Sequence, residues 1–371
     1  MKISIGSKIV DGPFGGGNEF LKNLITYLEE SNHQVINHLR DLDIDIVLLT
    51  NPLIDSETST YNNYDIDYYL SFKNPSCITF QRINECDERK NTNYINSKIS
   101  KLNKNIDINI YVSDWLKEIY EDYDLNKKRH HVIKGGPDEK IFNNQNKVYW
   151  DKKTKLKVVT HHWSSNWMKG FDVYRKLDQL LSKDYIKQKL EFTYIGNLPK
   201  NFTFQNTNVI RPLGNNELAN ELKLHHVYIT GSINEPSGNH HMEAAMSGLP
   251  ILYNDSGALP EYCNDFGVVF NIETLEDSIN LIIEEYDNLI KKLDSYPYTL
   301  KNAAKTYIDA FETSLEEKEN IKNERKKQIK IIILMRLLGD KAVRLLYSLM
   351  LLIKINLGRF KRKVDYGKSS Y

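Results

Sequence analysis

Residues 227–261 read VYITGSINEPSGNHHMEAAMSGLPILYNDSGALPE, and this stretch decides the fold. Its first four residues are β-branched or aromatic, which favours a buried strand. A polar loop follows, and helix-forming residues occupy positions 239–247. Gly248 lies where a helix C-terminal glycine belongs, and a second apolar run begins at Ile251. The order strand, helix, strand predicts a parallel sheet in an α/β protein.

Two carboxylates, Glu235 and Glu243, flank the start of this helix. The helix N-terminus would be formed by Ser237, Gly238 and Asn239, where free N–H groups make a ready anion site. Carboxylates suit hydroxyl groups, because one carboxylate accepts two hydrogen bonds from a vicinal diol. An anion site beside diol-binding groups predicts a sugar nucleotide as ligand. The alternative is a surface helix that carries two ordinary glutamates.

The same residues resemble a known motif. Residues 235–250, EPSGNHHMEAAMSGLP, are similar to the E-x7-E donor motif of retaining glycosyltransferases of family 4, which have the GT-B fold. In that family the first glutamate faces the donor sugar and the second holds the nucleotide ribose, which implies these roles for Glu235 and Glu243. The following GALPE is similar to the family's glycine-pair, Pro-Glu segment, with Ala258 in place of one glycine.

The resemblance covers roughly residues 1–300 in order, and it implies a domain organisation. We expect a GT-B protein with two doubly wound, Rossmann-like α/β domains facing a cleft, followed by an amphipathic helical tail. Residues 1–150 would form the acceptor-side domain and residues 151–300 the nucleotide-sugar domain. Residues 301–371 would hold a helix that crosses back, and then a basic amphipathic tail. A chain of 371 residues is long enough for two domains.

A run of glycines at positions 15–17 stands between a first predicted strand, residues 2–6, and a first helix. Glycines permit close approach of the backbone to a phosphate or sugar. The dinucleotide-binding pattern is not met, because Phe20 occupies the place of its third glycine. The loop resembles the first glycine loop of family 4, which implies donor contacts from Gly16 and Gly17. A tight turn that needs positive φ is the alternative.

Residues 81–90, QRINECDERK, follow a strand predicted over 77–81. Charges and amides at the carboxyl end of a strand are placed where α/β sheets bind ligands, although a solvated charged loop would read the same way. The run resembles an RxNExDERK segment of a bacterial subgroup of family 4. Where the wider family has a histidine near the transferred sugar, this chain has Gln81, which cannot act as a base. The resemblance leaves these candidates: Gln81 and Arg82 as catalytic residues, and Asn84 and Glu85 as acceptor contacts.

Lys169, in the dipeptide Lys-Gly, matches a family lysine that binds the donor diphosphate. Most members add an arginine about six residues earlier, where this chain has Trp163 or His162. A lone lysine is a point charge and not a bidentate clamp. The diphosphate would therefore also be bound by Arg82 or by backbone amides, or its binding would be weaker.

No cofactor or metal is expected. The D-x-D pairs at 43–45 and 65–67 are interpreted as solvated turns, since a metal site in a parallel sheet belongs beyond the strand's carboxyl end. The histidine pairs at 161–162, 225–226 and 240–241 lack a third ligand at suitable spacing. The three cysteines show no paired spacing and predict a reduced compartment.

Charge divides the chain unevenly. Residues 316–371 hold 15 Lys and Arg against 6 Asp and Glu, whereas the rest holds 35 against 43. Residues 329–357 place their charges on one helical face, and a basic cluster follows at 359–363. A basic amphipathic helix of this kind favours peripheral contact with an anionic membrane through 329–363. Packing on its own domain or on a partner subunit is the alternative.

Other classes of partner and location are disfavoured. Nucleic acid is not expected, because the aromatic interleaving of a stacking platform is absent. No apolar run reaches the roughly 20 residues of a spanning helix, and the first residues are typical of a strand and not of a signal peptide. A cytoplasmic protein is therefore expected, either free or peripheral on the inner face of the cell membrane.

The sequence as a whole predicts a hexosyltransferase. It would move a hexosyl unit from a nucleotide sugar to a saccharide acceptor, with retention of configuration and without a metal. The acceptor would be lipid-linked or a precursor of a cell-surface polysaccharide. The alternative, favoured by Gln81 and the absent arginine, is a catalytically weak sugar-nucleotide-binding scaffold in a glycan assembly complex.

Overall fold

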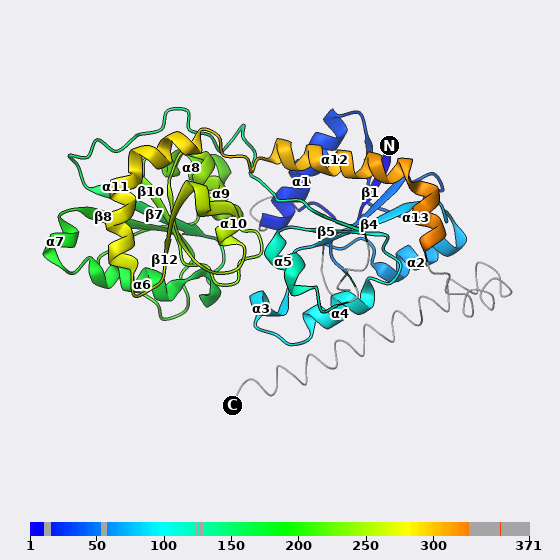
Figure 1. Ribbon diagram of the computed structural model, residues 1–371, viewed down its shortest axis with the longest axis horizontal. Helices are drawn as coiled ribbons and strands as arrows, with labels where there is room; N and C mark the ends of the chain where they lie inside the picture. The colour runs from blue at the N-terminus through cyan, green and yellow to red at the C-terminus, as the bar shows by residue number, and fades with distance from the viewer. Residues whose placement is uncertain (11–15, 53–57, 124, 126–128, 326–348, 350–371) are drawn as a thin grey trace.

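The computed structural model describes residues 1–10, 16–52, 58–123, 125, 129–325 and 349. Figure 1 shows two α/β halves side by side, each built around one sheet. The predicted membrane-binding stretch at 329–363 lies outside the described residues, apart from position 349. Within the described part, no helix has the length and apolar character to cross a membrane.

The N-terminal half contains a six-stranded sheet in the order β2-β1-β3-β4-β5-β6, and every neighbouring pair of strands is parallel. Its central strands are buried, as parallel strands covered on both faces require: β3 is wholly apolar, and β4 also holds Gln81 and Arg82. Its strands are β1 (Lys2–Ile5), β2 (Gln34–Ile36), β3 (Ile46–Leu49), β4 (Ile78–Ile83), β5 (Ile108–Tyr111) and β6 (Arg129–Val132). The described helices of this half are α1 (Gly16–Glu30), α2 (Asn63–Phe72), α3 (Asp87–Lys90), α4 (Ile95–Leu102) and α5 (Asp114–Ile119).

The C-terminal half contains a second six-stranded parallel sheet, in the order β12-β11-β10-β7-β8-β9. Its strands are β7 (Leu156–His162), β8 (Leu190–Gly196), β9 (Asn208–Ile210), β10 (Val227–Thr230), β11 (Ile251–Asn254) and β12 (Gly267–Phe270). Its helices are η2 (Trp167–Lys169), α6 (Phe171–Leu180), α7 (Asp184–Lys187), α8 (Asn215–Leu222), α9 (Asn239–Met246), α10 (Leu259–Cys263), η3 (Asn264–Phe266) and α11 (Leu275–Leu293).

The chain then returns to the first half. Helix α12 (Leu300–Glu316) packs against α1 and crosses it, as Figure 1 shows, and α13 (Lys318–Glu324) follows it. Tyr307 and Phe311 of α12 are buried in one cluster with Phe20 of α1 and Phe80 of β4. The ring centroids of Phe80 and Phe311 are 4.9 Å apart. This apolar contact ties the end of the described chain to its beginning.

The predicted fold class, two doubly wound α/β units, is confirmed by these topologies. Two local predictions are wrong. Strand β4 continues to Ile83 and does not end at Gln81, because Arg82 joins the ladder opposite Ile110. The 65–67 pair is helical and not a solvated turn, since Asp65 completes a capping box with Asn62 at the start of α2.

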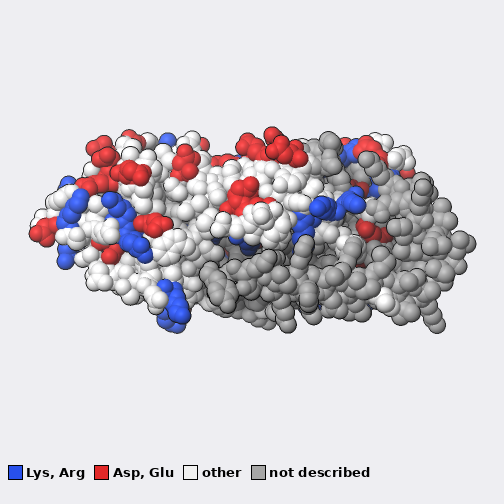
Figure 2. Space-filling view, turned by 90° about the horizontal axis from the view of Figure 1, so that it is seen from below, with Lys and Arg blue, Asp and Glu red and all other residues white. Residues whose placement is uncertain are grey.

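Each sheet has a switch point, where the chain order of its strands reverses, and α/β proteins bind ligands at the carboxyl ends of the strands there. In the first sheet it lies between β1 and β3, and in the second between β7 and β10. Figure 2 shows Lys and Arg side chains interspersed with Asp and Glu on the C-terminal half of the face that it views.

Candidate functional site

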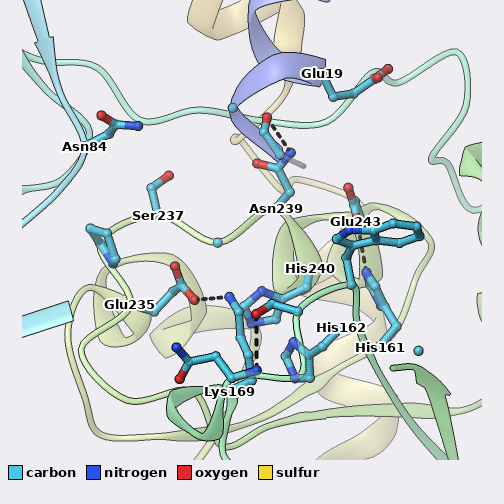
Figure 3. A pocket seen from close by; sticks show the side chains of 18 of the residues that line it. Glu19, Asn84, His161, His162, Lys169, Glu235, Ser237, Asn239, His240 and Glu243 are labelled. Carbon is cyan, nitrogen blue, oxygen red and sulfur yellow. Dashed lines mark hydrogen bonds and ion pairs between the residues drawn. The ribbon is translucent and has the colours of Figure 1, made fainter. Parts of the chain in front are cut away.

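A cavity of about 470 Å³ lies between the two halves, and residues from both of them line it. The N-terminal half contributes the start of α1 and the chain after β4, and the C-terminal half contributes the ends of β7 and β8 and the start of α9. Figure 3 shows the side chains from the second half gathered at this cavity. The predicted site residues that line it are Gly16, Gly17, Arg82, Asn84, Glu85, Lys169, Glu235, Ser237, Gly238, Asn239 and Glu243.

Gln81 is the predicted site residue that is not among the cavity-lining residues. Its side chain is fully buried, and its Oε1 accepts a hydrogen bond of 2.9 Å from Asn103 Nδ2. Successive residues of a strand point to opposite faces, so Arg82 faces the cavity and Gln81 faces the other way. Of the two catalytic candidates on this strand, Gln81 is therefore placed away from the cavity and Arg82 lines it.

Glu235 is the most tightly held carboxylate of the cavity. Its Oε2 accepts from Lys169 Nζ at 2.8 Å and from Arg89 Nη2 at 3.0 Å, and its side chain is 7% exposed. Burial by itself would raise the pKa of Glu235, but the two cations outweigh it and lower that pKa to about 2. Glu235 is thus ionised at neutral pH despite its burial.

Two glycines fix the backbone that presents this group. Gly170 has φ +96° and ends the 3-10 helix that carries Lys169, and a Cβ there would overlap the backbone of Gly231. Gly257 has φ +65°, and a Cβ there would overlap the backbone of Glu235. The N–H of Ala258 donates to the carbonyl of Glu235 at 2.9 Å. The loop of Glu235 is therefore held by backbone contacts that only glycine permits.

Arg89 is a cavity residue that the sequence analysis did not single out. It lies in the RxNExDERK segment, whose charged pattern indicates a ligand site. The local sequence does not show which of these charged residues contacts the other half. Its Nη1 also donates to the carbonyls of Ile233 and Met168, at 2.7 and 3.2 Å. One arginine of the first half thus contacts two loops of the second.

The start of α9 faces the cavity, as predicted from its glycine and hydroxyl residues. Gly238 precedes the helix, and a Cβ there would come within 2.5 Å of the His240 ring. Ser237 Oγ accepts a hydrogen bond of 3.0 Å from Tyr262. Asn239 Nδ2 lies 3.5 Å from the carbonyl of Gly16, so the first turns of α9 and α1 meet across the cavity.

Glu243, one turn inside α9, pairs with His161 at the end of β7. The distance from His161 Nε2 to Glu243 Oε2 is 2.8 Å, and Figure 3 shows this contact. His161 is not among the predicted site residues, because a histidine pair has no local signal that identifies its partner. The contact turns Glu243 toward the cavity that it lines.

Three further histidines are buried at the cavity: His162 and His240 are among its lining residues, and His241 lies outside the lining. His162 meets the hydroxyl of Tyr174 at 2.6 Å, and His240 meets that of Thr230 at 3.0 Å. His241 is fully buried, and neither of its ring nitrogens has a hydrogen-bond partner among the described residues. Burial lowers the pKa of all three, that of His241 to about 3, so these rings are neutral.

The wall formed by the first half carries Arg82, Asn84 and Glu85. The Arg82 guanidinium lies 4.6 Å from the ring centroid of Phe20, and no carboxylate of the described residues forms an ion pair with it. Glu85 pairs with Lys90 at 3.1 Å. Arg82 is therefore a largely buried cation that faces the cavity.

No cluster of three or more His, Cys, Asp or Glu suited to a metal ion occurs within the part of the chain that the structure describes. The three cysteines are all buried and unpaired, and burial raises the pKa of each of them. These thiols lie outside the cavity lining.

Comparison with solved structures gives the fold a name. Sucrose-phosphate synthase from Thermosynechococcus elongatus superposes with a TM-score of 0.60 at 11% identity, over 85% of this chain and 99% of that one. The chain has the GT-B fold. A glycosyltransferase from Rickettsia africae gives a TM-score of 0.58 at 12% identity, over 85% and 98% of the two chains. An α,α-trehalose 6-phosphate synthase from Burkholderia multivorans gives 0.55 at 10% identity, over 81% and 76%.

A scan against protein-family models and a search of the curated proteins both gave no match.

Proposed function

We propose that this GT-B protein is a glycosyltransferase that moves a hexosyl unit from a nucleotide sugar to a saccharide acceptor. The observation that carries the proposal is the pairing of two glutamates in one cavity. Glu235 and Glu243 line the same cavity on either side of the α9 N-terminus. A diol-binding carboxylate at each side of an anion site matches a sugar and a ribose joined by a diphosphate.

The charges around Glu235 support an anionic donor. Lys169 and Arg89 supply two positive charges against the single negative charge of Glu235. Their side chains are 18% and 12% exposed, so the surplus charge is poorly solvated and favours an anion close by. We assign the donor diphosphate to this position, together with the N–H groups at Ser237, Gly238 and Asn239 at the start of α9.

The low pKa of Glu235 limits what this residue can do. A carboxylate with a pKa of about 2 is a poor proton acceptor near neutral pH. We therefore assign Glu235 to hold hydroxyls of the donor sugar and to stabilise positive charge at its anomeric carbon. Glu243, oriented by His161, would hold the ribose.

The acceptor would enter from the side of Asn84 and Glu85, with Arg82 available for negative charge near the reacting atoms. The acceptor oxygen would bond to the anomeric carbon as the bond from that carbon to the nucleoside diphosphate breaks, and the hydroxyl proton would pass to the leaving diphosphate oxygen. We propose that configuration is retained. Gly16 and Gly17 at the start of α1 would allow the donor to approach the backbone. Two proteins of similar structure, sucrose-phosphate synthase and UDP-forming α,α-trehalose-phosphate synthase, are named for reactions of this general kind.

The test is a thermal-shift screen against UDP-glucose, UDP-galactose, UDP-N-acetylglucosamine and GDP-mannose. We expect one of them to raise the melting temperature, and Glu243→Ala to abolish the shift. Glu284→Ala, on the exposed face of α11, is the matched control and should keep it. If no nucleotide sugar shifts well-folded protein, the donor-site assignment is wrong. With a donor in hand, the coupling constant of the product's anomeric proton reports retention.

A second candidate function is a sugar-nucleotide-binding scaffold in a glycan assembly complex. The observation that favours it is the buried side chain of Gln81, which does not line the cavity. A scaffold would bind a nucleotide sugar without turning it over. Donor turnover with any member of an acceptor panel would exclude this candidate.

We also propose that the acceptor is lipid-linked or a polysaccharide precursor at the cytosolic membrane face. This rests on the sequence of residues 329–363, a basic amphipathic pattern outside the described residues. Sedimentation with vesicles that contain anionic lipid should retain the full chain and lose a variant that ends at residue 325. Equal binding of both proteins would refute the role of the tail.

A further inference from the structure

The segment of residues 85–90 lies against the C-terminal half, although it belongs to the first sheet's half. Arg89 donates to Glu235 Oε2 at 3.0 Å and to the carbonyls of Ile233 and Met168. Beside it, Asn234 Nδ2 donates a hydrogen bond of 3.1 Å to the carbonyl of Glu88. The contacts therefore run in both directions between this segment and the loop that carries Glu235.

The geometry of Arg89 is suited to arginine alone. Its guanidinium donates to two carbonyls and one carboxylate at once, which a planar fork with five N–H groups allows. A lysine could keep the charge, but its ammonium is a compact point charge and could not bridge these groups. The side chain is 12% exposed, so the contacts are largely shielded from water.

Asp87 makes the segment rigid from within. Its carboxylate accepts from the N–H groups of Tyr94, Ile95 and Asn96 at 2.8 to 3.1 Å, and from Thr92 Oγ1 at 2.6 Å. Partial burial opposes ionisation, but these bonds prevail and the pKa of Asp87 lies below its ordinary value. Arg89 is thus attached to a segment with fixed backbone geometry.

We propose that Arg89 is a positioning residue that completes the cavity from the opposite half by fixing Glu235 and the loop of residues 231–235. The inference rests on the proposed function only in taking Glu235 as the group that faces the donor sugar. Lys169 holds the same carboxylate oxygen from within the second half. Glu235 consequently has its full set of partners when segment 85–90 is docked against the second half.

Reciprocal coupling follows from this arrangement. Docking of the segment orients Glu235, so a ligand that needs the oriented carboxylate also favours docking. The two halves also meet away from Glu235, where Glu261 of α10 accepts from the backbone N–H groups of Asp114 and Trp115 and pairs with Lys134. Among the described cavity contacts, Arg89 therefore links the docking of segment 85–90 most directly to the orientation of the Glu235 carboxylate.

The first experiment is hydrogen exchange on the free protein, which needs no ligand. In Arg89→Met we expect the amides of Ile233 and Ala258, which donate to Met168 and Glu235, to exchange at least about tenfold faster. Lys90→Met is the matched control, since Lys90 lies in the same helix and pairs with Glu85 of its own half. It should leave those amides within about twofold of the wild type.

Arg89→Lys separates charge from geometry and should exchange like Arg89→Met. Equal exchange rates in Arg89→Met and the wild type would overturn the inference. So would full restoration by Arg89→Lys, because charge alone would then suffice. These outcomes are independent of donor identity, so they distinguish failure of this inference from failure of the proposed function.

The second readout separates positioning from general stability. With UDP-glucose, or whichever nucleotide sugar the screen identifies, we expect Arg89→Met to lower kcat about 100-fold. KM should rise by a smaller factor, because loss of the Arg89 charge beside the proposed diphosphate position also weakens donor binding. A side chain that acts through Glu235 affects the transition state more than it affects binding of the ground state. An unchanged kcat in a folded variant would refute the positioning role.

Discussion

Replacing His241 by leucine should make the protein more resistant to acid. His241 is fully buried on α9 between His240 and Tyr262, with ring centroids 5.0 and 5.2 Å away. Burial lowers its pKa to about 3, with Lys169 lowering it further and Glu235 opposing. In the unfolded chain the same imidazole has a pKa near 6.5.

The sign follows from proton linkage. Below about pH 6.5 His241 binds a proton in the unfolded chain but not in the folded protein. The free energy of unfolding therefore falls as the pH falls toward the folded-state pKa of about 3. Between pH 7 and pH 5 this single histidine removes about 2 kcal/mol from the free energy of unfolding. Leucine has no titratable group, so its packing cost or gain is the same at both pH values.

The measurement is urea unfolding of wild type and His241→Leu at pH 7, 6 and 5. The difference in unfolding free energy between the two proteins should move in favour of the variant by about 2 kcal/mol over this range. Met242→Leu, at the adjacent fully buried position, is the control, and its difference from wild type should be independent of pH. A difference for His241→Leu that stays constant within about 0.5 kcal/mol would refute the reasoning, because the ring would then be protonated in the folded state.

Two further substitutions test how the cavity is supported. Gly170→Ala should destabilise the protein by more than about 1 kcal/mol and weaken nucleotide-sugar binding, because a Cβ at φ +96° overlaps Gly231 and displaces Lys169. Thermal melting measures the stability, and the donor screen measures the binding. Unchanged values would contradict the close approach of Gly170 to Gly231. Tyr174→Phe removes the hydroxyl that meets His162 at 2.6 Å and accepts from the N–H of Gly231 at 3.2 Å. It should cost about 1–3 kcal/mol in urea unfolding, and a neutral result would show that water replaces the hydroxyl.

Elements with a strong local pattern could be predicted from the sequence. Strand β10 has the predicted ends, residues 227–230, because β-branched and aromatic residues mark it. Helix α9 begins at Asn239 as predicted and ends one residue before the predicted position 247. The end of β4 was misplaced, since Arg82 breaks the apolar run and yet pairs in the ladder. Helix α2 was missed because its Asn and Asp residues, read locally, favour turns.

The candidate site was likewise predictable only where its residues are close together in the sequence. A helix start with two glutamates is contained within nine consecutive residues, so its chemistry could be read directly. The partners of those glutamates could not, because Arg89 is 146 residues from Glu235 and His161 is 82 residues from Glu243. A local pattern contains no information about which distant charge a fold will bring near, and that choice is made by the packing of the two sheets.

This division also indicates where the cavity is vulnerable. Glu235 is held by two cations, but the positions of those cations depend on groups that carry no charge. Lys169 is placed by the contact of Gly170 with Gly231, and Arg89 by the backbone amides that Asp87 binds. An ion pair that is mostly buried is stabilising only when its geometry is good, because each charge has lost solvation. Changes to these backbone supports should therefore impair Glu235 nearly as much as removal of either cation.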